Sequence, residues 1–232
     1  TLLGYSQIMP NNGTADSKPE YYALKNAHIY ISPDKKIKGT ILIKDDKIVK
    51  VGPFVSIPNG AVEIDCSGKT ILPAFIELSS DVGVPKAKAS PGPKPQLETG
   101  KKGAFYWNES IHPEVNATAL YVADKKANLA LIEMGFGFAM THQQDGIARG
   151  QGAFVSLGEK SEPLLNGSST SSYFSFKKGV SKQSYPSSQM GSIALLRQAL
   201  YDGQWYKENN DKKNLSLEAL NAQTKETMFF QT

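Results

Sequence analysis

One short apolar segment constrains the fold more than any other part of this sequence. Residues 70–78 are nearly continuously apolar, and a short apolar run of this kind is typical of a strand in a parallel sheet that is covered on both faces. Two polar side chains, Ser79 and Asp81, follow the run directly. We therefore expect these two side chains at the carboxyl end of a buried strand.

Composition and charge exclude several classes of protein. The chain has 232 residues, 40% of them hydrophobic and 21% charged, which is ordinary for one large globular domain or two small ones. Its net charge of +4 comes from lysine pairs spread along the chain, so we expect no nucleic-acid partner. The single Cys66 excludes an intramolecular disulfide and a cysteine-based zinc cluster. No apolar run is long enough to span a membrane.

Patterning along the chain predicts three regions. Residues 1–20 are rich in Asn, Gly and Pro and predict an irregular lead-in. Residues 21–68 predict a small antiparallel β domain, because short β-rich runs alternate with turn residues such as Asp45 and Asp46. Residues 69–232 alternate between strand and helix patterns, which favours a parallel sheet. The strands expected in the β domain cover residues 23–31, 39–44, 47–51 and 61–64.

The third region contains further predicted elements and two long loops. Helical spacing covers residues 116–134, with Gly135 as the C′ residue, and further helices cover 190–206 and 215–222, the last with Ser216 as a possible N-cap. Strands are expected at 136–141, 152–157 and 227–230. The loops are a Pro- and Lys-rich segment at 84–103, too long for an ordinary connection, and a Ser-rich stretch at 161–188.

Residues 62–77, V-E-I-D-C-S-G-K-T-I-L-P-A-F-I-E, resemble the N-terminal part of the amidohydrolase superfamily, in particular its imidazolonepropionase-like members. Residues 135–152 and 185–206 are more narrowly similar to the N-terminal unit of large secreted tandem amidohydrolase-related proteins of the Bacteroidetes type. This resemblance implies an α/β fold in which a small antiparallel β unit precedes the first part of a (β/α)₈ TIM-type barrel. We expect that barrel to be incomplete and the chain to be a fragment.

The resemblance also implies an activity and a cofactor. Family members hydrolyse C–N bonds other than peptide bonds, and zinc or a similar divalent ion activates the attacking water. The first two ligands in the family are histidines of an H-x-H motif, and here these positions carry Ser79 and Asp81. A later family histidine corresponds to Gln231. Hydroxyl and amide groups are poor ligands for zinc, so we expect a degenerate metal site, no metal and no identifiable catalytic residue.

The three histidines of the chain suggest a different kind of site. His142 ends a predicted strand, and with Asp145 and Arg149 it could bind an anion or a substrate; a structural role is the alternative. His28 lies in the β unit and is interpreted as structural. His112 precedes a proline and is interpreted as a local hydrogen-bonding residue.

Three hypotheses for the function follow. The first is a degenerate amidohydrolase-like unit that acts as a structural or binding domain of a larger protein. The second is part of an active amidohydrolase whose catalytic groups lie outside this chain. The third is an accessory subunit of an outer-membrane complex. For each we expect an extracytoplasmic location, and we expect the remainder of the same protein or a partner chain to complete the barrel.

Overall fold

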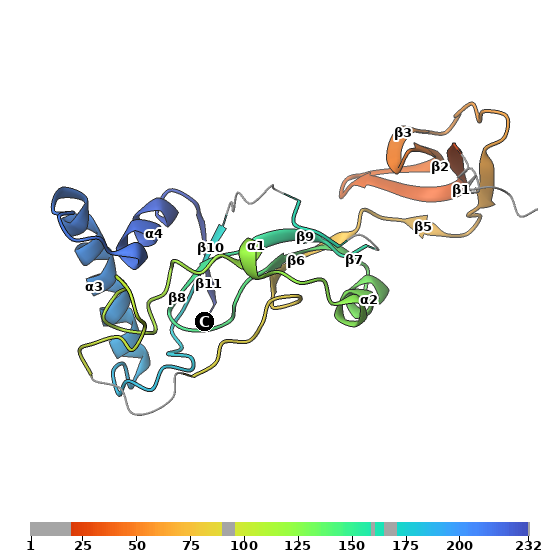
Figure 1. Ribbon diagram of the computed structural model, residues 1–232. Helices are drawn as coiled ribbons and strands as arrows, with labels where there is room; N and C mark the ends of the chain where they lie inside the picture. The colour runs from red at the N-terminus through yellow and green to blue at the C-terminus, as the bar shows by residue number, and fades with distance from the viewer. Residues whose placement is uncertain (1–19, 90–95, 159–160, 165–170, 232) are drawn as a thin grey trace, which may run out of the picture. The chain divides into compact units, whose positions relative to one another are not determined.

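The computed structural model describes residues 20–89, 96–158, 161–164 and 171–231 and divides the chain into two compact units (Figure 1). The first unit comprises Thr1–Pro73 and the second Ala74–Thr232. Nearly all of the predicted lead-in, residues 1–19, lies outside the described residues. Within the described part of the chain, no helix is both long and apolar enough to cross a membrane.

The first unit is a five-stranded sheet around a small apolar core. Its central strand β1 pairs with β2 on one side and with both β4 and β5 on the other, while β3 extends the sheet beyond β2. Ala27, Ile29, Ile41 and Cys66 form the buried core. The strands are β1 (Tyr21–Ser32), β2 (Lys35–Lys44), β3 (Lys47–Gly52), β4 (Val62–Asp65) and β5 (Thr70–Ile71).

This sheet is mixed, so the expectation of a wholly antiparallel unit was wrong. The pairs β1–β2 and β2–β3 are antiparallel. The predicted turn between β2 and β3 has Asp45 and Asp46 at positive φ. In contrast, β4 and β5 both run parallel to β1. A tight turn can join only antiparallel neighbours, and the longer connection over residues 53–61 carries the chain back to the start of β1.

The apolar run at residues 70–78 forms two strands instead of the single strand predicted. Thr70–Ile71 is β5 of the first unit, whereas β6 (Phe75–Ser80) belongs to the second unit and pairs with β7. Pro73 lies between them, and proline has no N–H to donate to a strand ladder. The expected cover on both faces is also missing among the described residues, because Phe75 is 57% exposed and Leu78 53% exposed.

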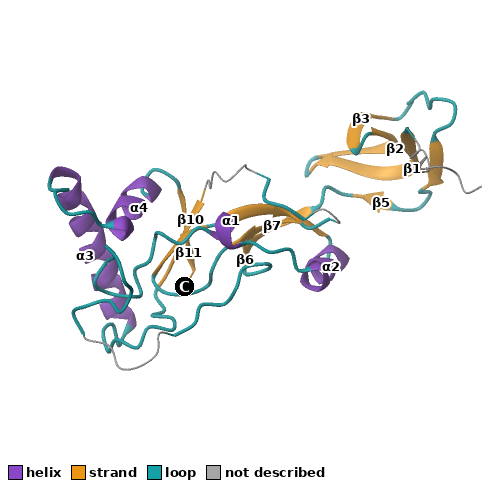
Figure 2. Ribbon diagram, in the orientation of Figure 1, coloured by secondary structure: helices purple, strands orange, loops and turns teal. Residues whose placement is uncertain are grey.

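In the described residues of the second unit there are two three-stranded sheets and four helices, and Figure 2 shows their arrangement. One sheet has the order β6-β7-β9 and the other β11-β10-β8. Each combines one parallel pair with one antiparallel pair, which corrects the prediction of a single parallel sheet. The remaining elements are α1 (Ala117–Leu120), α2 (Lys125–Glu133), β7 (Phe136–Thr141), β8 (Ala148–Gln151), β9 (Ala153–Ser156), β10 (Ser171–Ser175), α3 (Gln189–Glu208), α4 (Leu215–Gln223) and β11 (Thr227–Gln231).

Helix boundaries follow local capping chemistry. The predicted helix at 116–134 is divided into α1 and α2, because Tyr121 is extended and the Asp124 carboxylate accepts hydrogen bonds from the first N–H groups of α2. Gly135 follows α2 with a φ of 95°, which confirms the predicted C′ residue. Helices α3 and α4 are confirmed. The N-cap of α4 is Asn214, so the expectation for Ser216 was wrong.

Strands β8 and β10 were not predicted from the sequence. β10 lies inside the Ser-rich stretch, and all five of its residues are buried. Residues 148–156 connect the two sheets, because their first half, β8, pairs with β10 and their second half, β9, pairs with β7. This connection brings residues that follow β7 close to residues of β10 and β11.

Helices α3 and α4 cover one face of the β8-β10-β11 sheet (Figure 1). Phe174 of β10 packs in their common core with Leu195 and Leu196 of α3 and Leu217 and Leu220 of α4. The opposite side chains of β10 and β11 face the polar residues described below.

We predict that Leu220→Ala lowers the free energy of unfolding by about 2–5 kcal/mol, since it removes a side chain that is only 1% exposed and leaves a cavity. Leu129→Ala, in the exposed part of α2, is the matched control and should change it by less than about 0.5 kcal/mol. Urea unfolding followed by circular dichroism measures both. Equal losses in the two variants would contradict the assignment of the core.

Candidate functional site

Polar side chains from several elements converge where β7, β10 and β11 end. His142 directly follows β7, Asp145 lies in the next turn, Arg149 is in β8, and Gln231 is the last residue of β11. The charge of Arg149 acts on both His142 and Asp145. The structure therefore brings together the three residues that the sequence suggested for ligand binding, and it adds Gln231 to them.

Arg149 is a buried cation that links four parts of the second unit. The residue is only 4% exposed. Nε donates to the carbonyl of Gly146 at 3.1 Å, Nη2 donates to Oγ of Ser175 at 2.9 Å, and Nη1 donates to Oε1 of Gln231. Burial lowers the pKa of Arg149, and the nearby Asp145 carboxylate partly offsets this. We call Arg149, Ser175 and Gln231 the Arg149 cluster.

His142 is held in place by stacking and has no polar partner for its ring. Its backbone N–H donates to the Ser80 carbonyl at 2.9 Å, which ties the end of β7 to β6. The ring is 3.7 Å from that of Tyr173, measured between centroids, and Tyr173 stacks in turn on Phe229. Neither ring nitrogen has a hydrogen-bond partner among the described residues. Burial, helped by the charge of Arg149, lowers the pKa of His142 to about 3, so the imidazole is neutral near pH 7.

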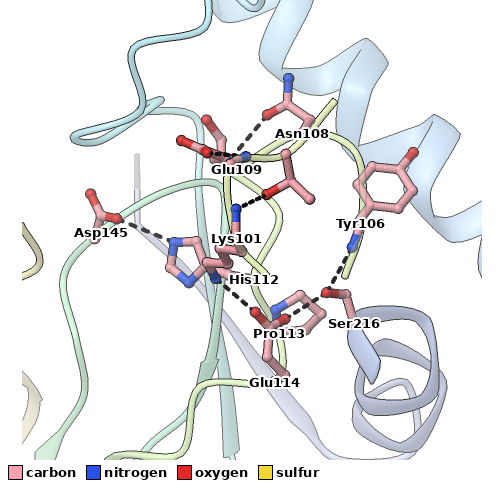
Figure 3. A network of polar contacts seen from close by, with 12 residues as sticks. Lys101, Tyr106, Asn108, Glu109, His112, Pro113, Glu114, Asp145 and Ser216 are labelled. Carbon is pink, nitrogen blue, oxygen red and sulfur yellow. Dashed lines mark hydrogen bonds and ion pairs between the residues drawn. The ribbon is translucent and has the colours of Figure 1, made fainter. Parts of the chain in front are cut away.

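Asp145 contacts a second histidine that the sequence did not connect with it (Figure 3). Its Oδ2 lies 3.3 Å from Nε2 of His112, and its Oδ1 accepts the N–H of Val180 at 2.8 Å. Burial alone would raise the pKa of Asp145, but the contacts with His112 and Val180 and the charge of Arg149 outweigh burial and lower it. The carboxylate is therefore ionised at neutral pH.

A polar network holds the segment that carries His112 against α4 (Figure 3). The Ser216 hydroxyl donates to Glu114 at 2.8 Å and accepts the backbone N–H of Tyr106 at 3.1 Å. Lys101 forms an ion pair with the same glutamate at 2.8 Å. Ser216 therefore stabilises a tertiary contact and does not cap α4 as the sequence predicted.

The three positions to which the sequence resemblance assigns metal ligands have different surroundings. Ser79, near the end of β6, has a buried hydroxyl without a partner among the described residues, and Asp81 is exposed. Gln231 is bound to Arg149. No group of three or more His, Cys, Asp or Glu side chains among the described residues could hold a metal ion. A neutral hydroxyl, one carboxylate and an amide beside a fixed cation do not fit zinc, which prefers imidazole, thiolate and carboxylate ligands.

Two cavities lie beside these residues. One, of about 300 Å³, is lined by Asp81, Gln143 and Asp145 among others, and we call it the Asp81 cavity. The other, of about 260 Å³, is also lined by Gln143 and Asp145, together with His112 and three lysines, and we call it the lysine cavity. The lysines are Lys86, Lys88 and Lys101. Sequence patterns could not identify this group, because its members lie in loops without periodicity.

Comparison with solved structures shows what fold the chain has. Over 85% of its length it superimposes on the crystal structure of an amidohydrolase from Thermotoga maritima, with 20% sequence identity and a TM-score of 0.60. The chain shares its fold with that amidohydrolase. It spans 54% of the length of that structure.

Two further structures give weaker matches. One is an uncharacterized protein, with a TM-score of 0.33; the match covers 54% of this chain and 27% of that protein. The other is a prolidase complexed with N-methylphosphonate-L-proline, with a TM-score of 0.29; the match covers 51% of this chain and 25% of the prolidase. Their sequence identities to this chain are both 19%. No family model and no curated protein matches the sequence.

We predict that Arg149→Gln lowers the free energy of unfolding by about 2–4 kcal/mol, because it breaks the charged hydrogen bonds to Gly146 and Ser175 and removes the donor to the amide oxygen of Gln231. Arg197→Gln removes an exposed arginine of α3 and should cost less than about 0.5 kcal/mol. Urea unfolding of both variants measures the difference. A value for Arg149→Gln as small as that of the control would contradict the structural role of the cluster.

We also predict a loss of stability in acid that depends on His142. The pKa of this histidine is 6.5 in the unfolded chain and about 3 in the folded one, so between these values the unfolded chain binds more protons. The free energy of unfolding should therefore fall as the pH drops from about 6.5 towards 3, by at most about 1.4 kcal/mol per pH unit from this group. His142→Phe keeps the ring stack and should show a shallower dependence over this window. Identical pH profiles would refute the assignment.

Proposed function

We propose that this chain is an amidohydrolase-fold unit that binds a ligand and does not hydrolyse one through a metal ion of its own. The observation that carries the proposal is the position of Arg149, whose guanidinium is bound to Ser175 and Gln231 at the carboxyl ends of β10 and β11. The resemblance in the sequence assigns an imidazole ligand to Gln231. A fixed positive charge therefore lies where a divalent cation would need a ligand, and two like charges repel each other.

The neighbouring groups support a binding role. The Asp81 cavity opens beside residues that follow β6 and β7, and ligands of α/β proteins commonly bind outside the carboxyl ends of strands. It is lined by amide, carboxylate and ammonium side chains, from Gln143, Asp145 and Lys86. Such convergent polar groups can orient a small ligand without any covalent step.

The second candidate is a unit of an active amidohydrolase whose catalytic groups lie outside these 232 residues. One observation favours it: the chain spans about half of the Thermotoga structure that it matches. In this case Arg149 and His142 would stabilise the unit, and the hydrolytic groups would come from another part of the full protein.

We infer in addition that further strands pair with the second unit. Among the described strands, β6 is one of the two outer strands of its sheet and β11 one of the two of the other; β6 exposes Phe75 and Leu78, and β11 exposes Met228. An apolar outer strand in water is an aggregation risk that proteins avoid by covering it. Strands from the remainder of the protein or from a partner chain would complete a barrel here. The tandem organisation, the extracytoplasmic location and the outer-membrane complex stay predictions from the sequence.

Metal analysis of the full-length protein separates the two functions. We expect no stoichiometric zinc that depends on Asp81 or His142, so Asp81→Asn and His142→Phe should leave the metal content unchanged. Near-stoichiometric metal that both substitutions remove would overturn the proposed binding role. Metal and hydrolysis that persist in both variants, and disappear only when sequence outside residues 1–232 is deleted, would support the second candidate.

A further inference from the structure

The lysine cavity has the features of an anion-binding site. Three ammonium groups line it, from Lys86, Lys88 and Lys101, and Lys101 is anchored by its ion pair with Glu114. Lys86 and Lys88 are exposed and have no ion-pair partner among the described residues. The volume of about 260 Å³ is suited to a small molecule.

A buried imidazole without a full set of partners completes the wall of this cavity. His112 is 3% exposed, and its Nε2 faces the ionised carboxylate of Asp145. Its Nδ1 has no hydrogen-bond partner among the described residues. A buried polar atom without a partner is unfavourable, and it is uncommon in a part of a fold that serves packing alone.

The backbone around the His112–Asp145 pair is built to allow this close contact. Gly146 has a φ of 73°, and a Cβ there would lie 2.3 Å from Nε2 of His112. Gly179 has a φ of 74°, and a Cβ there would lie 2.0 Å from Oδ1 of Asp145. Any other residue at either position would force the acid and the imidazole apart, in addition to straining the backbone.

The charges around the cavity decide which ligand it favours. The negative charge of Asp145 faces His112 and is balanced further by Arg149. Glu109 is the remaining acid in the wall, and one of its oxygens accepts the N–H of Gly100 at 2.8 Å. Pairing Lys101 with Glu114 and Asp145 with Arg149 leaves Lys86 and Lys88 against Glu109, so the local field is attractive to negative charge.

We infer that the lysine cavity binds a small molecule through a doubly charged oxyanion, held by Lys86, Lys88 and Lys101. A phosphate group and a pair of carboxylates share this chemistry. The inference rests on the proposed function, because it names the ligand class of a unit that binds without its own metal.

Calorimetric titration with sulfate, inorganic phosphate and succinate tests this site in the full-length protein. Sulfate is the main probe because its charge does not change between pH 6 and 8; the other two distinguish a tetrahedral group from a pair of carboxylates. We expect saturable binding that is weakened roughly three- to tenfold by combining Lys86→Gln with Lys88→Gln. Lys207→Gln, on α3, is the matched control and should bind as the unmodified protein does.

Two single variants give opposite expected signs. Glu109→Gln removes the opposing carboxylate and should tighten sulfate binding, whereas His112→Gln removes a polar group of the cavity wall and should weaken it. Thermal unfolding of each variant verifies that it is folded, and the glutamate variant keeps the test valid if His112→Gln unfolds. Sulfate binding that is absent, or equal in the double lysine variant and the control, would overturn the site.

This result is separable from that of the metal analysis. Failure of sulfate binding in a protein without metal at Asp81 and His142 would contradict the anion site alone. Metal bound through Asp81 and His142 together with intact sulfate binding would contradict the metal-independent role and leave the anion site standing.

Discussion

The second unit depends on the satisfaction of one buried cation. Arg149 cannot lose its proton at any ordinary pH, so its burial is tolerable only if acceptors surround it. The structure provides them from the turn after β7, from β10 and from β11. Because these elements come from residues 146–231, a single guanidinium fixes the relative positions of segments that are distant in the sequence. The connection of the two sheets through β8 and β9 carries Arg149 to that place.

The same cation contributes to the protonation states of its neighbours. Burial and the guanidinium charge both disfavour a second positive charge, which keeps the ring of His142 neutral, while Asp145 is kept ionised by His112, by the N–H of Val180 and by Arg149. The two histidines near this region therefore differ in chemistry. His142 acts as a flat apolar surface against Tyr173, and His112 lies beside a carboxylate at the wall of a polar cavity.

The sequence predicted the elements whose cause is local and failed where the cause is distant. Helices α3 and α4 follow from apolar spacing, and Gly135 from the need for positive φ after α2. Residues 62–77 carry the resemblance that implied the amidohydrolase fold. β10 could not be predicted, because a Ser-rich segment becomes a buried strand only when β8 and β11 pair with it. The contact between His112 and Asp145 joins loops 33 positions apart and leaves no periodic signal.

The Arg149 cluster also bears on the position to which the sequence resemblance assigns an imidazole ligand. If a histidine occupied position 231, its neutral ring could accept one hydrogen bond from Arg149 or offer that lone pair to a metal ion, but not both. The guanidinium would remain buried beside it and would oppose a divalent cation electrostatically. Ser79 and Asp81 would still contribute only a hydroxyl and one carboxylate. Metal binding through position 231 would therefore compete with the hydrogen bonds by which Arg149 connects β8, β10 and β11. The stability of the unit and metal binding at this position thus make incompatible demands on the same residue.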